Sequence, residues 1–287
     1  MRLSFVKMHG LGNDYILFDA SDCAVEGIDL GQLAKDLCRR RFSIGADGIA
    51  VLSMGGADAD IHMRVFNPDG SEAGSCGTAF RCAARYAFER KGFAEATTSG
   101  VRIATSHRNV LARIVQSEDD RTLVEVRMGK ALFGRGDIPA VGPGDEDFLE
   151  QPIAIQGEEL TVSAVSVGNP HAVVFCDDAS NIPLTRLGPA IENHPVFPRR
   201  TNVHFVQIIS RSELKVRTWE RGTGPTLSCG TGASAAVAIA SRLGKVDTPV
   251  QVQMPGGILK IDVDQLGEIT MLGEAEPVFS GWIEYEA

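Results

Sequence analysis

Short runs of the sequence alternate apolar and polar residues, with Val, Ile and other β-branched residues prominent among the apolar ones. Most of these runs end at Gly, Pro, Asn or Asp, which favour turns. Such a pattern is typical of β-strands that bury one face. It predicts strands at 3–8, 15–19, 61–66, 101–105, 122–128, 160–167, 171–175, 202–209, 214–219, 250–254, 258–263 and 279–286.

Helical spacing of apolar residues is strongest in four segments, at 31–41, 76–91, 183–192 and 229–243. Glycines at 92 and 244 stand where a left-handed residue commonly ends a helix, just after the second and the fourth segment. The fourth segment is apolar on all sides up to Ser241. A helix of that kind is normally enclosed by other structure. We therefore expect a sheet-rich α+β chain with one fully buried helix.

The two halves of the chain repeat the same motifs in the same order. Gly-Asn occurs at Asn13 and again at Asn169, each time followed by a predicted strand. Cys-Gly-Thr then begins a predicted helix at Cys76 and at Cys229, after 63 and 60 residues respectively. A repeat of this length indicates two copies of one structural unit.

The spacing also suggests where the units divide. In both halves a predicted strand ends nine residues before the cysteine, at Asn67 and at Glu220. We expect two pseudo-symmetric domains, the first at 1–128 with 274–287 returning to it, and the second at 129–273.

Composition narrows the class of partner. The 287-residue chain has a formal net charge of −9 and no long cluster of Lys or Arg, so we expect neither nucleic acid nor an anionic membrane as a partner. Neither a secretory signal nor an apolar run of membrane-spanning length is present, which predicts a cytoplasmic protein. A small molecule is the expected ligand.

The six cysteines are scattered, and they form no Cys-x-x-Cys or Cys/His cluster with zinc spacing. We therefore expect thiols rather than a disulfide framework, and no metal site. Four of them are interpreted as core residues, the commonest role of an isolated cysteine: Cys23, Cys38, Cys82 and Cys176.

The repeated Cys-Gly-Thr motif favours a chemical role for Cys76 and Cys229. A helix N-terminus offers unpaired N–H groups and the positive end of the helix dipole, which bind a carboxylate and favour a thiolate. Two such termini on opposite sides of one substrate carbon make an acid–base pair, with one thiolate removing a proton and one thiol returning a proton to the other face. This arrangement predicts a racemase or epimerase that works without a cofactor.

Seven stretches resemble, in order and spacing, the diaminopimelate epimerase family. They are KMHGLGNDYILFD, IGADGIAVL, FNPDGSEAGSCGTAFRCAARYAFE, VSVGNPHAVVF, RRTNVHFVQI, WERGTGPTLSCGTGASAAVA and MPGGILKI. The resemblance spans nearly the whole chain. It implies two barrel-like α+β domains around central helices, a possible homodimer, no cofactor, and interconversion of LL- and meso-2,6-diaminopimelate in the formation of lysine and peptidoglycan precursors.

The resemblance also implies roles for individual residues. Cys76 and Cys229 are the implied acid–base pair, with His171 and Glu220 as neighbours that tune or relay protons for them. Backbone amides are implied to hold the reacting carboxylate, and amide or guanidinium side chains are implied to bind the rest of the substrate. The first group comprises Gly77, Thr78, Gly230 and Thr231, and the second comprises Asn13, Asn67, Asn169, Asn202 and Arg221, with Glu220 beside it.

The chain departs from the family pattern mainly in the first motif. Thr78 and Ala79 stand where the family usually has Asn and Gly, so the contacts of an asparagine side chain are lost. If position 79 requires a positive φ or a very close approach, the methyl group is costly. Pro225 replaces a common glutamate.

Four other functions match parts of the pattern. A related racemase acting on another amino acid and a thiol oxidoreductase both use activated cysteines, and oxidation of the pair to a disulfide is a further expectation. A Gly-x-Gly-x-x-Ala match begins at Gly230, but the preceding predicted strand ends too far away for a dinucleotide-binding turn. An amino-acid-binding protein without catalytic activity needs the same contacts but no thiols.

Overall fold

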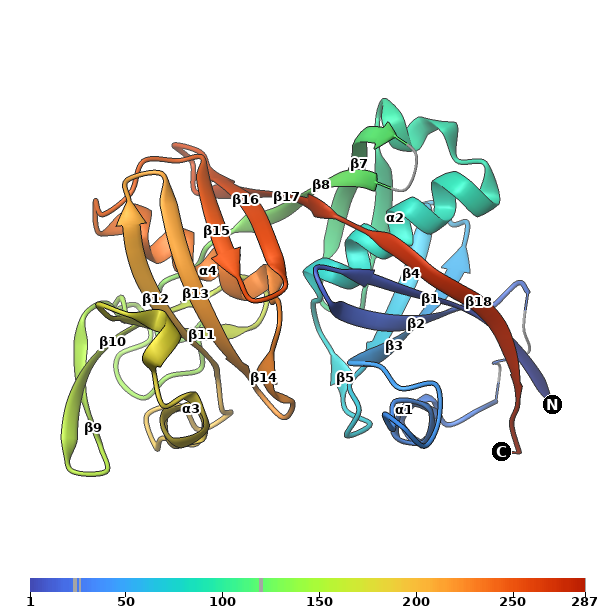
Figure 1. Ribbon diagram of the computed structural model, residues 1–287. Coiled ribbons are helices and arrows are strands. Elements are labelled where there is room, and N and C mark those ends of the chain that lie inside the picture. The colour runs from blue at the N-terminus through green and yellow to red at the C-terminus, as the bar shows by residue number, and fades with distance from the viewer. Residues whose placement is uncertain (23–24, 26, 119–120, 287) are drawn as a thin grey trace. The chain divides into compact units, whose positions relative to one another are not determined.

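The computed structural model describes residues 1–22, 25, 27–118 and 121–286, so Cys23 lies outside the described residues. The chain forms two compact units (Figure 1). Unit 1 comprises Met1–Arg127 and Leu272–Ala287, and unit 2 comprises Met128–Met271. Strands β8 (Arg121–Lys130) and β17 (Glu268–Glu274) carry the chain across the two boundaries.

In unit 1, strands both precede and follow the longest helix along the sequence. Its other elements are β1 (Arg2–Gly10), β2 (Asn13–Asp19), α1 (Leu30–Leu37), β3 (Gly48–Met54), β4 (Ile61–Phe66), β5 (Glu72–Ala73), α2 (Gly77–Lys91), a 3₁₀ turn (Ala94–Thr97), β6 (Val101–Ala104), β7 (Asn109–Glu118) and β18 (Glu276–Glu284).

Unit 2 follows the same order of strands and helices, after one extra strand. Its elements are β9 (Gln151–Ile155), β10 (Glu158–Ser166), β11 (Pro170–Phe175), a 3₁₀ turn (Ala179–Asn181), α3 (Leu184–Glu192), β12 (Asn202–Ser210), β13 (Glu213–Glu220), β14 (Gly224–Thr226), α4 (Gly230–Arg242), β15 (Val250–Met254) and β16 (Gly257–Val263).

The strand pairings are duplicated as well as the order of elements. In unit 1, β1–β2 is antiparallel, β2–β3 parallel, β3–β4 antiparallel, β4–β6 parallel and β6–β7 antiparallel. In unit 2, the same series runs β10–β11, β11–β12, β12–β13, β13–β15 and β15–β16. The expectation of two copies of one α+β unit is therefore confirmed at the level of topology.

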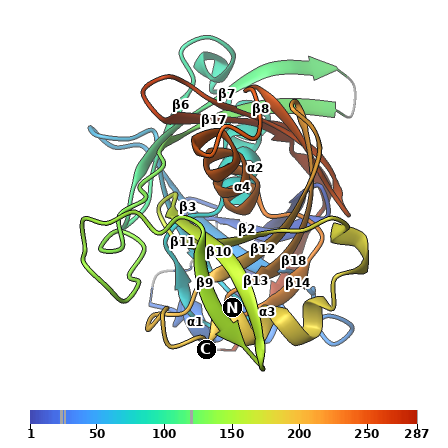
Figure 2. The same ribbon diagram turned by 90° about the vertical axis from the view of Figure 1, so that its left-hand side faces the viewer.

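A buried helix occupies the interior of each unit. Every residue of α4 from Gly230 to Ala240 is buried, and the helix packs against β10, β11, β12, β13 and β16 (Figure 2). Helix α2 is likewise buried from Gly77 to Ala87 and packs against β1, β2 and β7. The apolar sequence of the fourth predicted helix is explained by this enclosure.

The helix ends follow from local sequence. Gly92 caps α2 in the left-handed conformation (φ 68°), and Gly244 follows α4 with φ 67°. The helix expected at 31–41 is shorter, because α1 ends at Leu37 and Arg41 has a positive φ of 73° that a helix cannot include. Among the described residues, none of the helices is both long and apolar enough to cross a membrane.

The structure adds strands that the alternation did not predict, notably β3, β7 and β17. In β3 the first five residues are all buried, so the strand has no polar face to produce an alternating pattern. The last strand, β18, pairs with β1 at the start of the chain.

Candidate active site

Cys76 is the residue that caps the N-terminus of α2. Its backbone is extended (φ −142°, ψ 110°), and its Sγ atom accepts a hydrogen bond from the Ala79 N–H at 3.4 Å. The same sulfur lies 3.1 Å from the Tyr15 hydroxyl oxygen, to which the thiol donates. Cys76 is half-buried.

Cys229 occupies the equivalent position at the start of α4. Its backbone has nearly the same conformation (φ −139°, ψ 108°), and its Sγ atom accepts from the Gly232 N–H at 3.4 Å. The Thr231 hydroxyl is 3.5 Å from the sulfur. The two expected cysteines therefore have the same local geometry, each in its own unit.

The first N–H groups of both helices have no carbonyl partner within the helix, as at any helix start. In α2 these belong to Gly77 and Thr78, and in α4 to Gly230 and Thr231. They lie beside the capping sulfur at the positive end of the helix dipole. Each terminus can stabilise a thiolate and bind a carboxylate oxygen, which are the two properties expected from the sequence.

The glycine of the second motif is required by packing, whereas the first motif has no such requirement. A Cβ atom at Gly232 would lie 2.7 Å from Nδ1 of His204, a contact that real side chains do not make. Ala79 is an ordinary buried residue of α2 without a positive φ. Position 79 therefore does not need a left-handed backbone, and its methyl group is compatible with the helix.

The surroundings of the Thr78 side chain argue against a role for it in ligand binding. It is 1% exposed, and its hydroxyl accepts from the buried Arg81 guanidinium at 3.4 Å. Arg81 also donates to the Glu274 carbonyl oxygen at 2.9 Å. Only the backbone N–H of Thr78 remains as a candidate for carboxylate binding.

A chain of four polar side chains runs through the interior of unit 2. Asn169 Oδ1 lies 2.7 Å from His171 Nε2, His171 Nδ1 lies 2.8 Å from His204 Nε2, and His204 Nδ1 lies 3.1 Å from the Thr218 hydroxyl. Both imidazoles are fully buried. Burial lowers the pKa of His204 to about 3 and also lowers that of His171, which the neighbouring His204 and Arg221 lower further. Both rings are neutral at pH 7.

Asn202 connects this series of hydrogen-bonded side chains to the segment that contains Arg221. It is paired with His171 across the parallel strands β11 and β12. Its Nδ2 donates to the Pro170 carbonyl at 2.8 Å, and its Oδ1 accepts from the Arg221 N–H at 3.0 Å. The amide thus fixes the backbone at both neighbouring segments.

Arg221 is a partly buried cation. Its guanidinium donates to the Arg199 carbonyl at 3.1 Å, and within the described part of the chain it forms no ion pair with a carboxylate. Burial and the nearby Arg200 lower its pKa. A partly buried guanidinium that forms no ion pair with a described carboxylate is suited to binding an anionic ligand. The adjacent Glu220 accepts from the Thr226 hydroxyl at 2.6 Å.

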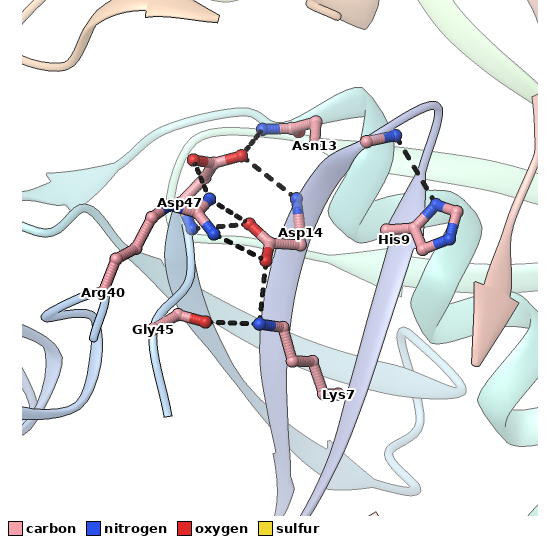
Figure 3. A network of polar contacts seen from close by, with 8 residues as sticks. Lys7, His9, Asn13, Asp14, Arg40, Gly45 and Asp47 are labelled. Atoms are coloured by element: carbon pink, nitrogen blue, oxygen red, sulfur yellow. Dashed lines mark hydrogen bonds and ion pairs between the residues drawn. The ribbon is translucent and has the colours of Figure 1, made fainter. Parts of the chain in front are cut away.

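In unit 1, Asn13 belongs to a network of charged side chains (Figure 3). Its Nδ2 donates to Asp47 Oδ2 at 3.0 Å, and the same oxygen accepts from the Asp14 N–H at 3.1 Å. Arg40 bridges Asp47 and Asp14 at 2.7 and 2.6 Å, and Lys7 lies 2.9 Å from Asp14. Because its Nδ2 is held by a carboxylate, Asn13 has its Oδ1 left to accept from a ligand.

The two acidic residues of this network differ in their pKa shifts. Burial acts to raise the pKa of Asp14, but hydrogen bonds from Arg40 and Lys7 outweigh it and hold that pKa below its usual range. Burial and the nearby Asp14 carboxylate raise the pKa of Asp47. The network therefore depends on Arg40, which bridges the two carboxylates, and on Lys7, which pairs with Asp14.

Asn67 is held in a turn of its own. Its backbone N–H donates to the Ser71 carbonyl oxygen at 2.9 Å, and its Nδ2 donates to the Ser71 hydroxyl at 3.0 Å. Gly70, within the same turn, has φ 85°. This geometry is that of a turn-forming asparagine, with Oδ1 as its remaining acceptor.

The remaining described cysteines differ from this pair. Burial raises the pKa of Cys38 and of Cys82 to about 12, and that of Cys176 is raised by burial and by Asp177. All three are poor thiolates. Cys38 and Cys82 are buried, as expected for core residues, whereas Cys176 is half-buried and packs against the edge of a hydrophobic cluster. The part of the chain that the structure describes contains no group of three or more His, Cys, Asp or Glu side chains arranged for a metal ion.

Sequence reasoning missed three side chains that the structure places beside predicted site residues: Tyr15, Asp47 and His204. Tyr15 and His204 each lie two residues after a predicted asparagine, so strand periodicity puts them on the same face as that asparagine. That periodicity was the available signal. Asp47 lies 34 residues after Asn13, just before β3, and only the fold brings the two together.

Solved structures define the class of fold. A hydroxyproline epimerase from Agrobacterium vitis, solved with bound trans-4-hydroxy-L-proline, is similar to this chain with a TM-score of 0.72 at 17% identity, covering 98% of this chain and 92% of that one. A methylitaconate-delta-isomerase has a TM-score of 0.60 at 16% identity, with 99% and 95% covered. The expected two-domain α+β fold is thus one found in an epimerase and in another isomerase.

The sequence relatives define the family. The diaminopimelate epimerase family model matches residues 5–133 and 163–278. The diaminopimelate epimerase of Methanothermobacter thermautotrophicus is 42% identical over 284 residues, covering 96% of this chain and 97% of that protein. The enzyme of Pelotomaculum thermopropionicum is 43% identical over 283 residues, with 99% of both chains covered. The chain therefore belongs to the diaminopimelate epimerase family, and the expected isomerase class is confirmed.

Proposed function

We propose that this protein interconverts LL- and meso-2,6-diaminopimelate by acid–base chemistry between Cys76 and Cys229. In each direction one thiolate removes the α-proton, and the electron pair of the broken C–H bond passes toward the α-carboxylate. The other thiol then donates its proton to the opposite face of the same carbon. The sulfurs exchange protonation states, so atoms and charge balance without a cofactor.

The helix termini supply the electrostatic part of this mechanism. Backbone N–H groups of Gly77, Thr78, Gly230 and Thr231 bind the reacting carboxylate and stabilise the negative charge that grows on it as the proton leaves. The capping geometry of both sulfurs supports this role, because each already accepts an N–H bond from its own helix.

The remaining proposed residues bind the substrate away from the reacting carbon. Arg221 binds the distal carboxylate with its guanidinium fork, supported by its lack of an ion-pair partner among the described residues. Asn13 and Asn67 offer carbonyl oxygens to an ammonium group, and Asn169 offers N–H donors. Asn202 binds the substrate and also fixes the backbone of Arg221, while His171 and Glu220 tune or relay protons for the two cysteines.

One observation carries the proposal. Two units with the same series of strand pairings each present a cysteine as the N-cap of a buried helix, in a chain that belongs to the diaminopimelate epimerase family. A single structural cysteine gives no reason for the same capping geometry to occur twice.

The test follows the α-proton. The reduced protein is incubated with LL-diaminopimelate in D₂O without added cofactor, and deuterium incorporation and the meso isomer are measured. Cys76→Ser and Cys229→Ser are each expected to lower the rate about 10²–10⁴-fold. Cys176→Ser, which alters a half-buried thiol of unit 2, is the matched control and should retain the wild-type rate. Near-normal rates for both site variants would refute the mechanism.

The same proposal includes a place in lysine and peptidoglycan precursor formation and a homodimer, both inferred from family membership, and a cytoplasmic location, which the sequence predicts. Sedimentation of the purified protein tests the dimer. A substrate panel of diaminopimelate, lanthionine, glutamate and histidine tests the preference, since a related racemase would act on a different member of the panel.

A further inference from the structure

His204 lies outside the residues to which the proposed function assigns a role, yet it is fully buried next to them. It follows Asn202 by two residues on β12 and rests against Gly232 in the first turn of α4. Its two ring nitrogens contact His171 and Thr218 and no other described side chain. A buried imidazole with both nitrogens bonded is a fixed group, not a mobile one.

The bond directions along this chain of side chains can be assigned from Asn169. Its Oδ1 faces His171 Nε2, and an amide oxygen only accepts, so with Asn169 in this orientation the proton lies on Nε2 of His171. The neutral ring then carries an acceptor at Nδ1, which requires His204 to donate from Nε2. His204 Nδ1 is left as an acceptor for the Thr218 hydroxyl proton. In this arrangement every hydrogen bond from Thr218 to Asn169 has one donor and one acceptor, and all of them run in the same direction.

We propose that His204 is a positioning residue for Asn169, acting through His171. By donating to His171 Nδ1 it keeps the proton on His171 Nε2, and this proton holds the Asn169 oxygen inward. The amide NH₂ group is then turned toward the site, where it donates to an anionic group of the substrate. The inference rests on the proposed function, because Asn169 is a substrate-binding residue only within it.

The orientation of the amide matters because the two ends of an asparagine side chain have opposite hydrogen-bonding properties. If Asn169 turned over, an oxygen would face the substrate carboxylate in place of two N–H donors. The reversed chain of bonds is also self-consistent, with His171 donating from Nδ1. The proton on His171 therefore discriminates between the two arrangements.

The first measurement is of the proton position itself. Protein labelled with ¹⁵N-histidine is expected to show the Nε2–H tautomer for both His171 and His204 in two-bond ¹⁵N–¹H correlation spectra, and His204→Gln and His171→Gln variants assign the signals. A predominant Nδ1–H tautomer at His171 would overturn the inference. This result does not depend on activity, so it is separate from the failure of the proposed function, which the α-proton exchange assay reports.

The second measurement is kinetic. Loss of one net hydrogen bond at a substrate contact corresponds to about a two- to tenfold change. His204→Leu is therefore expected to raise KM for diaminopimelate by that factor while kcat changes less than about twofold. His204→Gln, whose amide can still donate to His171, should restore KM. A fall in kcat alone, or no rescue by Gln, would overturn the inference.

Thr218 supplies a second pair of variants if His204→Leu fails to fold. Thr218→Val removes the hydroxyl at nearly constant volume, and Thr218→Ser keeps the hydroxyl. We expect a raised KM and a mixture of His171 tautomers for Val, and wild-type behaviour for Ser. Identical kinetics and spectra for the two variants would contradict the proposed chain of bonds.

Discussion

The buried histidine pair makes the stability of unit 2 sensitive to acid. In the unfolded chain His204 has an ordinary pKa of about 6.5, whereas burial lowers its pKa to about 3 in the folded protein. Between these values the unfolded state binds a proton that the folded state does not. The free energy of unfolding therefore falls as the pH is lowered below 6.5.

The size of this effect at pH 5 follows directly. Each pH unit below the unfolded-state pKa costs about 1.4 kcal/mol per histidine, so the interval from 6.5 to 5 costs about 2 kcal/mol for His204. The pKa of His171 is lowered in the same direction, which adds a second contribution of the same sign. The result at pH 5 is insensitive to the folded-state pKa as long as that value lies well below 5.

The assay is urea unfolding at constant ionic strength, at pH 7, 6 and 5, for the wild type and His204→Gln. We expect the difference in unfolding free energy between pH 7 and pH 5 to be smaller in the variant by about 2 kcal/mol. His62→Gln removes an exposed imidazole of unit 1 and controls for the loss of a histidine as such. Equal pH dependence in the wild type and His204→Gln would refute the argument.

Three further predictions concern packing and binding. Gly232→Ala should destabilise the protein by about 2–3 kcal/mol in urea unfolding, because the added methyl overlaps a buried ring. Ala79→Gly should destabilise it by only about 1 kcal/mol, through helix propensity. Equal losses for the two variants would contradict the difference between the motifs. Asp47→Ala should raise KM for diaminopimelate several-fold with a smaller effect on kcat, since Asn13 loses the acceptor that orients its amide; an unchanged KM would remove Asn13 from the binding site. Arg221→Gln should raise KM about 10- to 100-fold, which is the contribution of a hydrogen-bonded charge pair. The control is a substrate that lacks the distal carboxylate. An equally large increase in KM for that substrate would show that Arg221 does not bind the distal carboxylate.

Much of the fold is visible in the sequence because local patterns reflect local geometry. The alternating runs at 61–66 and 250–254 coincide with β4 and β15, and both predicted cysteine helices begin one residue after the cysteine. The end of α1 was placed too late, because the positive φ of Arg41 is not encoded by apolar spacing. Strand β3 escaped prediction because burial on both faces removes the alternation.

The candidate site divides in the same way. Helix caps are local, so the Cys-Gly-Thr motifs were sufficient to predict the conformation around Cys76 and Cys229. The contacts of the asparagines are not local. Asn13 is held by Asp47, and Asn169 is held through His171 by His204, in opposite orientations that no motif indicates.

The sequence alone determined the repeat, the strand-rich class and the two capped thiols, because each depends on periodicity or on residues adjacent in the chain. Only the tertiary structure decided why Gly232 is a glycine while Ala79 is not, and which end of each amide faces outward. These features depend on side chains that are 28 to 34 residues apart in sequence and are brought into contact by the pairing of strands and the packing of a helix against them. Close packing and hydrogen-bond direction are properties of that three-dimensional contact, so they cannot be read from either segment by itself.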